Sequence, residues 1–208
     1  ALIPAVLLCD EPCILENVPE ISDVSISLRI LYEMGAQVDY INRTTVRIST
    51  VGLKNFCVPY ESARRMRASY YFLGALLGKF GRARVSMPGG CPLGDRPIDQ
   101  HLKAFSALGA KCDIQHGMVD LTADKLTGNQ IYLDVVSVGA TMNAMLAAVR
   151  AEGLTVIENA AKEPHIVDLA NFLNSMGADI MGAGTDVIKV RGVQYLHGTT
   201  YSVIPDQI

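Results

Sequence analysis

Leu31-Tyr32-Glu33-Met34-Gly35-Ala36 has a pattern that the chain repeats twice, and this repetition determines the architecture that we expect. The later copies are Phe105-Ser106-Ala107-Leu108-Gly109-Ala110 and Leu173-Asn174-Ser175-Met176-Gly177-Ala178. In each copy, two apolar residues three positions apart precede a glycine, as in the last turn of an amphipathic helix closed by a residue that can adopt positive φ. We therefore expect three helices that end in the same way.

Each copy also has a short apolar strand upstream and a hairpin downstream. The strands are expected at residues 13–18, 83–88 and 154–159, and the first and third share a Glu-Asn pair. After the second copy, residues 111–114 and 118–122 are expected to pair through a turn at 115–117. The repeated unit is therefore βαβαββ, present three times.

Two further segments, Tyr70 to Leu77 and Thr141 to Val149, are apolar on nearly every face. Helices of this kind must be covered by protein all round. No Pro- or Ser-rich linker divides the chain, so residues 1–208 are expected to form a single α/β domain. Its architecture would be a pseudo-threefold inside-out barrel with buried helices and outer sheets. An ordinary helix-flanked parallel sheet is the alternative, but it requires helices with polar outer faces.

Composition and charge exclude several classes of function. The formal net charge is -3 and the Lys and Arg residues are scattered, which disfavours nucleic acid and anionic membranes as partners. The longest apolar runs are too short to span a bilayer. The five cysteines lack the spacing of zinc sites or disulfide frameworks, and the four histidines are expected on the surface or in loops. We expect a soluble, cytoplasmic protein without a metal or cofactor.

The segment from Met87 to His101 combines three glycines and three prolines and should form an irregular surface loop. Cys91 lies within it, five residues before Arg96. A nearby cation favours the thiolate, which is a nucleophile, whereas the thiol is a proton donor. Glycine amides and the Arg96 guanidinium suit a phosphate or carboxylate. From the residues alone, an incidental loop cysteine is the alternative to a functional one.

Residues 89–99 resemble the signature loop of the UDP-N-acetylglucosamine enolpyruvyl transferases, and segments at 66–69, 137–141 and 158–164 agree in order and spacing. The resemblance covers essentially the whole chain. It implies transfer of the enolpyruvyl group from phosphoenolpyruvate to the 3-hydroxyl of UDP-N-acetylglucosamine with release of phosphate. This reaction is the first committed step of peptidoglycan precursor synthesis.

The resemblance also implies roles for individual residues. Cys91 would protonate the methylene carbon of phosphoenolpyruvate and form a covalent adduct with it, and Arg96 would bind its phosphate. The uridine would lie against Pro97, Ile98, Asp99 and Gln100, although a helix-capping role is an alternative for Asp99. Arg67 would contact substrate, the alternative being a surface charge cluster with Arg64 and Arg65.

The segment Val136, Ser137, Val138 and Gly139 precedes a buried helix and would hold the diphosphate of the nucleotide sugar. From the residues alone, Ser137 is only a helix N-cap. The family often carries a lysine two residues before this serine, where this chain has Val135. The four cysteines other than Cys91 are interpreted as core thiols.

Family members are about twice as long as this chain and have two domains of the same design. The second domain is therefore expected to be a partner, and residues 1–208 alone are expected to be inactive. The alternatives are a shikimate-phosphate enolpyruvyl transferase, which should not need a loop cysteine, and a more distant RNA phosphate cyclase, which the acidic balance disfavours. A non-catalytic nucleotide-sugar-binding domain is a further alternative of a different class.

Overall fold

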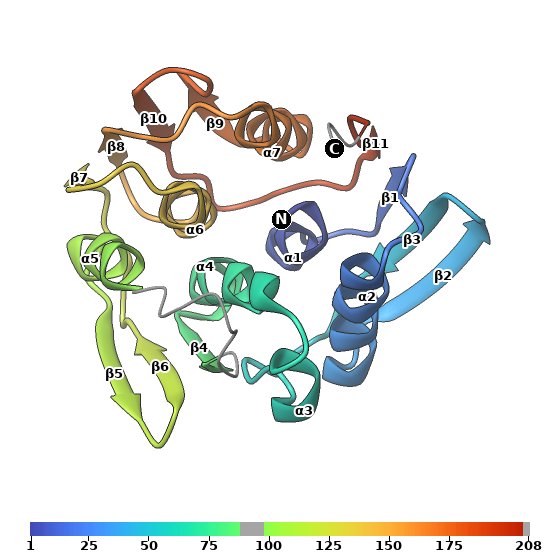
Figure 1. The fold of residues 1–208 in the computed structure, drawn as a ribbon. Coiled ribbons are helices and arrows are strands. Elements are labelled where there is room, and N and C mark those ends of the chain that lie inside the picture. Colours follow the sequence, from blue (N-terminus) through green and yellow to red (C-terminus); the bar gives the residue numbers. More distant parts are fainter. Residues whose placement is uncertain (88–97, 206–208) are drawn as a thin grey trace.

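The computed structural model describes residues 1–87 and 98–205, which form three β-sheets around a group of buried helices (Figure 1). The first sheet has the order β11-β1-β3-β2, formed by Thr200–Ser202, Cys13–Glu16, Thr45–Ser49 and Gln37–Asn42. The second has the order β4-β6-β5, formed by Arg82–Ser86, Met118–Thr122 and Lys111–Gln115. The third has the order β7-β8-β10-β9, formed by Gln130–Tyr132, Leu154–Glu158, Val187–Arg191 and Asp179–Met181.

The helices fall into two sets. The buried inner set comprises α1 (Leu2–Ala5) with the 3-10 turn η1 (Val6–Leu8), α4 (Tyr71–Phe80) and α6 (Val138–Ala148). The second set, one helix for each sheet, comprises α2 (Ser22–Met34), α5 (Asp99–Ala107) and α7 (Pro164–Ser175). A short helix α3 (Tyr60–Ala63) and a 3-10 turn η2 (Arg67–Tyr70) lead into α4.

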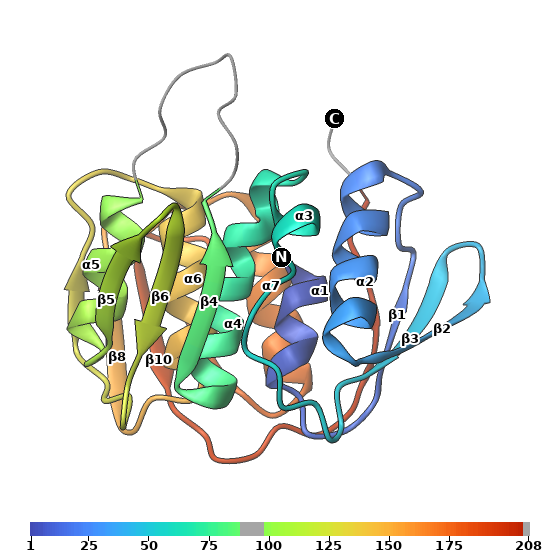
Figure 2. The same ribbon diagram turned by 90° about the horizontal axis from the view of Figure 1, so that it is seen from below.

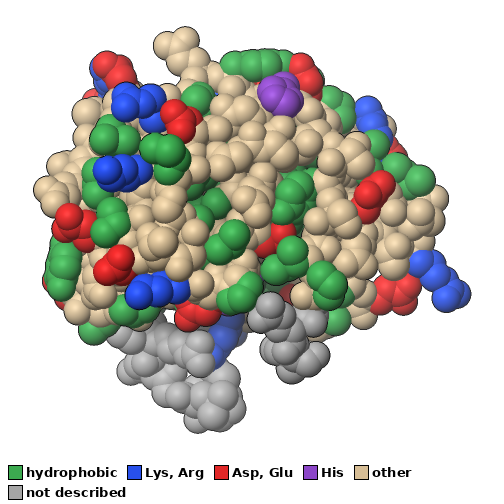
Figure 3. Space-filling model, turned by 90° about the horizontal axis from the view of Figure 1, so that it is seen from above, with side chains coloured by type: hydrophobic (Ala, Val, Ile, Leu, Met, Phe, Trp, Pro, Cys, Tyr) green, Lys and Arg blue, Asp and Glu red, His purple; other side chains and the backbone are tan. Residues whose placement is uncertain are grey.

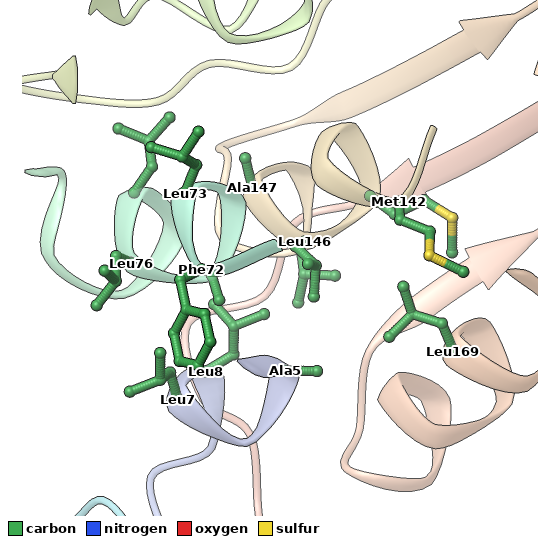
Figure 4. Packing of buried hydrophobic residues seen from close by; sticks show 14 of the residues in the cluster. Ala5, Leu7, Leu8, Phe72, Leu73, Leu76, Met142, Leu146, Ala147 and Leu169 are labelled. Atoms are coloured by element: carbon green, nitrogen blue, oxygen red, sulfur yellow. The ribbon is translucent and has the colours of Figure 1, made fainter. Parts of the chain in front are cut away.

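The inner helices form the centre of one continuous hydrophobic core, as their composition predicts. In α6 every residue from Ala140 to Ala148 is buried, and in α4 every residue from Phe72 to Leu77. Figure 4 shows Phe72 of α4 packed against Leu7 and Leu8, with Leu146 of α6 beside them. In the strands β3, β6 and β10 alternate residues are buried, so each sheet covers this core with one face.

The three predicted helix stops are confirmed. Gly35, Gly109 and Gly177 have φ angles of 108°, 98° and 104°. The alanine after each glycine donates its amide to the carbonyl five residues back, with N···O distances of 2.9, 3.0 and 3.1 Å to Leu31, Phe105 and Leu173. These bonds are those of a Schellman C-cap. The hairpin of β5 and β6 is also present, with Lys111 opposite Thr122.

The shared Glu-Asn pair has the same structural role in the first and third sheets. Asn17 and Asn159 follow β1 and β8, with φ angles of 55° and 57°. Asn17 Nδ2 donates to the carbonyl of Val203 at 2.8 Å, and Asn159 Nδ2 donates to that of Leu133 at 2.7 Å. Since residues 203 and 133 follow β11 and β7, strand β11 has the place in the first sheet that β7 has in the third.

The first strand of the predicted βαβαββ unit therefore differs among the three copies. Only the third copy has it in sequence order, as β7. The first copy receives it from the other end of the chain, because β11 pairs with β1 in parallel. In the second, the described residues show a single parallel bridge between Cys57 and Arg84. A strand of three residues or fewer is too short to leave a periodic pattern in the sequence.

On the face drawn in Figure 3, acidic and basic side chains are interspersed over the sheets. In residues 1–87 and 98–205, none of the helices has both the length and the apolar character needed to cross a membrane.

Asp10 joins segments from three parts of the chain. Its carboxylate forms ion pairs with Lys79 of α4 and with Arg150 after α6, both at 2.7 Å, and it accepts the amide of Leu196 at 3.0 Å. Arg150 also donates to the carbonyls of Leu8 and Gln194. Burial of the carboxyl acts to raise its pKa, but these hydrogen bonds together lower the pKa of Asp10 from its usual 3.8 to about 2.

We predict that Asp10→Asn lowers stability at neutral pH and weakens the acid dependence of unfolding. A carboxyl whose pKa is lowered by folding contributes stability above pH 3.8, and this stability is lost as the pH falls toward 2. Urea unfolding at pH 7, 4 and 2.5 should show the largest difference between wild type and variant at pH 7. An equal difference at all three pH values would contradict this role.

Helices α4 and α6 approach each other closely at Gly74 and Asn143. A Cβ atom on Gly74 would lie 2.6 Å from the Asn143 carbonyl oxygen. The buried Asn143 side chain bridges the helices, because its Oδ1 accepts the Gly74 amide at 2.9 Å and its Nδ2 donates to the Gly139 carbonyl at 3.2 Å.

Gly74→Ala should therefore push the two helices apart and destabilise the fold by about 1–3 kcal/mol, the usual effect of overpacking a core. Chemical denaturation measures this change. The control is Ser25→Ala on the exposed surface of α2, expected to change stability by less than about 0.5 kcal/mol. Equal stability of Gly74→Ala and wild type would show that the contact is not a packing constraint.

Candidate active site

The described part of the predicted site lies at one end of the molecule. Figure 2 shows β4 and the starts of α4, α5 and α6 meeting at this end. The predicted residues here are Arg67, Ile98, Asp99, Gln100, Val136, Ser137, Val138 and Gly139. Cys91, Arg96 and Pro97 lie outside the described residues.

Helix α5 begins without a side-chain cap. Its N-cap is the buried Ile98, and Asp99 is the exposed first helical residue. The capping role considered for Asp99 is therefore wrong, since its carboxylate accepts a hydrogen bond from the Gln100 side chain at 3.0 Å instead. Asp168 lies in the middle of α7, and its carboxylate accepts the Tyr201 hydroxyl at 2.6 Å.

Gln100 attaches the start of α5 to the segment that precedes α6. Its side chain is buried; Oε1 accepts the amide of Asp134 at 2.8 Å, and Nε2 donates to the Asp134 carboxylate at 3.3 Å. Lys103 forms an ion pair with the same carboxylate at 2.7 Å. Hydrogen bonds from Lys103 and Gln100 lower the pKa of Asp134, which stays charged. The structure thus brings together two segments that the sequence places 35 residues apart, 98–100 and 135–139.

Ser137 caps α6, as its position predicts, because its hydroxyl accepts the amide of Ala140 at 3.2 Å. The amides of Val138 and Gly139 precede the first intrahelical hydrogen bond, from Thr141 to the carbonyl of Ser137. The helix start therefore offers backbone donors and the positive end of the helix dipole to an anion. Val136, just before the cap, is 59% exposed, so this surface is open.

His101 is a residue of this site that the sequence analysis missed. It was expected on the surface or in a loop but is buried in α5, unlike His116, His165 and His197, which are exposed. A Cβ on Gly139 would lie 2.7 Å from His101 Nε2, so the glycine admits the ring to the start of α6. The Tyr70 ring lies 6.0 Å from the His101 ring, centroid to centroid.

Burial lowers the pKa of His101 to about 4 from its usual 6.5, against the opposing effect of Asp99. Its Nδ1 is buried and has no hydrogen-bond partner among the described residues. The imidazole beside the helix start is therefore neutral at physiological pH. The sequence signal that could have identified it is the polar pair Gln100-His101 on the core side of a predicted helix.

Arg67 is the first residue of η2, three positions before Tyr70. Its side chain is half-buried and has no ion pair with any described residue, whereas Arg64 and Arg65 are exposed. Arg64 stacks over the Tyr60 ring, 5.2 Å from its centroid. Arg67 thus stands apart from the surface cluster and lies at the same end of the molecule as Ser137.

The core interpretation of the other cysteines is correct for Cys9 and Cys13, which are buried, and wrong for Cys57 and Cys112, which are partly exposed. Cys112 lies in β5, and in a strand of a sheet with one solvent face an apolar context does not guarantee burial. Cys57 lies outside the strands. No group of three His, Cys, Asp or Glu side chains suited to a metal ion occurs in the described ranges.

A cavity of about 530 Å³ opens beside Val136. The connection from β8 to α7 forms much of its wall, through Asn159, Ala160, Lys162 and Glu163, and Asp186, whose carbonyl accepts the Ala160 amide, completes it. The candidate site therefore extends from the start of α5, across the start of α6, to the start of α7.

Comparisons with known proteins agree with the α/β fold. The family model described as EPSP synthase (3-phosphoshikimate 1-carboxyvinyltransferase) matches residues 1–208. The structure of the enolpyruvyl transferase NikO from Streptomyces tendae superposes on 98% of the chain with a TM-score of 0.85 and 26% identity, covering 48% of that protein. An EPSP synthase from Acinetobacter baumannii, at 20% identity, shares the fold over 97% of the chain and 47% of its own, with a TM-score of 0.74.

Fold and family model together define an α/β domain of the enolpyruvyl transferase fold. Among curated proteins, a UDP-N-acetylglucosamine 1-carboxyvinyltransferase of Caldanaerobacter subterraneus is 55% identical over 208 residues, all of this chain and 50% of that protein. One from Clostridium acetobutylicum is 57% identical over 209 residues, again half of its length. The chain belongs to the family of the UDP-N-acetylglucosamine 1-carboxyvinyltransferases and spans about half the length of the curated relatives it matches.

The buried His101 predicts a specific loss of stability in mild acid. The unfolded chain binds a proton near pH 6.5 and the folded chain only near pH 4, so stability should fall as the pH drops through this window. His101→Gln, which cannot be protonated, should reduce this pH dependence. Urea unfolding at pH 7.5, 5.5 and 4.5 tests this, and an unchanged pH dependence in the variant would contradict it.

Proposed function

We propose that the protein containing this chain transfers the enolpyruvyl group of phosphoenolpyruvate to the 3-hydroxyl of UDP-N-acetylglucosamine and releases phosphate, in peptidoglycan precursor synthesis. The observation that carries the proposal is the identity of more than half the residues with UDP-N-acetylglucosamine 1-carboxyvinyltransferases over the whole chain. We also infer that residues 1–208 are one domain, a pseudo-threefold inside-out barrel, and that a second domain of the same enzyme completes the site.

Cys91 and Arg96 carry the chemistry in this proposal. Arg96 holds the phosphate of phosphoenolpyruvate, and the Cys91 thiol gives its proton to the methylene carbon. The electron-poor neighbouring carbon is then attacked by the 3-oxygen of the sugar, whose proton passes to a base. If the cysteine sulfur attacks first, the covalent adduct must break its carbon–sulfur bond and expel the thiolate before the sugar oxygen adds to the same carbon. The bond from this carbon to the phosphate oxygen breaks, phosphate leaves, and loss of a methyl proton restores the double bond.

The described residues support the binding of the nucleotide sugar. The start of α6, with its Ser137 cap and the free amides of Val138 and Gly139, suits a diphosphate. The start of α5 is held beside it by the bonds from Gln100 to Asp134, so Ile98, Asp99, Gln100 and the adjoining Pro97 can bind the uridine of the same ligand. Arg67 provides a further cation for the negative charge of the nucleotide sugar. Charge separation in this reaction is best stabilised by such prearranged groups.

Two alternative functions differ from this proposal in ways that can be tested. A shikimate-phosphate enolpyruvyl transferase has the same fold, and the description of the family model names that activity. However, the chain is only 20% identical to the EPSP synthase from Acinetobacter baumannii. A non-catalytic nucleotide-sugar-binding domain would retain the starts of α5 and α6 without chemistry. We place the enzyme in the cytoplasm, where the Cys91 thiol stays reduced, and expect residues 1–208 alone to turn over no substrate.

Cys91→Ser in the full-length enzyme should reduce turnover by about 10²- to 10⁴-fold, the usual contribution of a general acid. Phosphate release is measured with phosphoenolpyruvate and either UDP-N-acetylglucosamine or shikimate 3-phosphate. Only the nucleotide sugar should support turnover by the wild type. Cys57→Ser, which changes a partly exposed thiol elsewhere, is the control.

The epoxide fosfomycin tests the same residue directly. Its ring should open on attack by the Cys91 sulfur, forming a carbon–sulfur bond that mass spectrometry locates. Resistance of Cys91 to alkylation in the presence of nucleotide sugar, together with normal turnover by Cys91→Ser, would contradict its assignment.

A further inference from the structure

Thr141 is a fully buried polar residue in the first turn of α6, and its side chain is not among the predicted site residues. Its hydroxyl makes two hydrogen bonds. Oγ1 donates to the carbonyl of Ser137 at 2.7 Å, and it accepts the amide of Ala161 at 3.1 Å. One donor bond and one acceptor bond satisfy a hydroxyl that water cannot reach. The hydroxyl therefore joins two segments that α6 and β8 separate in the sequence.

The first of these bonds acts on the N-cap of α6. The Ser137 carbonyl accepts the amide of Thr141 at 2.9 Å as well as its hydroxyl, while the Ser137 side chain accepts the amide of Ala140. Threonines inside helices often donate to the carbonyl four residues back. Here that carbonyl belongs to the cap, so the hydroxyl fixes the residue directly before the free amides of Val138 and Gly139.

The second bond acts on the connection from β8 to α7. The amide of Ala160 donates to the carbonyl of Asp186 at 2.9 Å, which ties the connection to the segment before β10. The amide of Ala161, a residue without exposed surface, is tied to α6 by Thr141. A buried backbone amide needs such a partner, and loss of the hydroxyl would leave this one unpaired.

The two joined segments form adjoining parts of the candidate site. Ser137 caps the helix start at which we propose that the diphosphate binds. Ala160 and Lys162, the neighbours of Ala161, line the cavity beside Val136. The position of this wall relative to the helix start is therefore set through one hydroxyl group in the core. Segments that form one site bind more tightly when they are held in place before the ligand arrives.

Thr155 in β8 shows a buried threonine without such a role. It is as fully buried as Thr141, but its Oγ1 has no hydrogen-bond partner among residues 1–87 and 98–205. Valine differs from threonine by a methyl group in place of the hydroxyl, so it can fill the space of either residue. Only at position 141 would this change remove hydrogen bonds seen in the structure.

We propose that Thr141 is a positioning residue, whose hydroxyl holds the Ser137 cap and the β8–α7 connection in the relative arrangement that binds the nucleotide sugar. Because Thr141 has no exposed surface, it acts through Ser137 and Ala161 rather than on the ligand. This inference rests on the proposed function, since it takes UDP-N-acetylglucosamine as the ligand.

Thr141→Val in the full-length enzyme tests the positioning role, because valine can form neither bond. Calorimetric titration should show binding of UDP-N-acetylglucosamine weakened about 3- to 10-fold, the effect of losing hydrogen bonds of ordinary strength. The KM for the nucleotide sugar should rise by a similar factor, whereas kcat at saturation should change by less than about twofold. Thr141→Ser keeps the hydroxyl and should retain the affinity of the wild type.

The matched control is Thr155→Val, the same substitution at an equally buried threonine. It should leave the affinity for the nucleotide sugar unchanged. A merely structural role of Thr141 would lower the folded fraction of Thr141→Val, and with it the stoichiometry of the titration and kcat. The dissociation constant of the folded enzyme would then stay at its wild-type value, and this result would overturn the positioning role.

Equal losses of affinity in Thr141→Val and Thr141→Ser would also overturn it, because they would trace the effect to the methyl group. If Thr141→Val does not fold, hydrogen exchange of the wild type decides: exchange of the Ala161 amide at the rate of an unpaired amide overturns the inference, and protection supports it. In each of these cases the wild type still binds UDP-N-acetylglucosamine, so the proposed function stands. Failure of the wild type to bind it would overturn both.

Discussion

The two long inner helices, α4 and α6, are held at a fixed separation by the contact between Gly74 and Asn143. At this point the helices are too close for any side chain on Gly74, and the Asn143 amide bonds to both. Because α6 is buried on every side, the sheets and second helices must take their positions around this pair. The Asn143 side chain also donates to the carbonyl of Gly139, which belongs to the first turn of α6. The contact in the core therefore also sets the position of the helix start at which we propose that the diphosphate binds.

The site is consequently built on rigid elements rather than on loops alone. Gln100 holds the start of α5 to Asp134, His101 packs on Gly139, and Tyr70 packs on His101. These contacts connect the starts of α4, α5 and α6 (Figure 2). Groups held in this way need little reorganisation when charge develops in a reaction.

Much of the fold could be predicted because the chain repeats itself. The Gly-Ala stops, the hairpin at 111–122 and the two wholly apolar helices are local patterns, and each is present in the structure. The pairing of β1 with β11 could not be predicted, since it joins residues nearly 190 positions apart through a strand of three residues. His101 and Asp134 were missed for a similar reason. Their surroundings come from distant segments, and one polar side chain in a helix or loop has no pattern of its own.

The place of β11 in the first sheet also affects how the chain can acquire its structure. In the first sheet, β1 lies between β3 and β11. In the sequence, however, all strands of the second and third sheets come between β1 and β11. During synthesis, the edge of β1 that pairs with β11 therefore stays unpaired until residues 200–202 have left the ribosome. Strand β1 is thus made well before its partner β11, and chaperones have an exposed strand edge to protect in the interval.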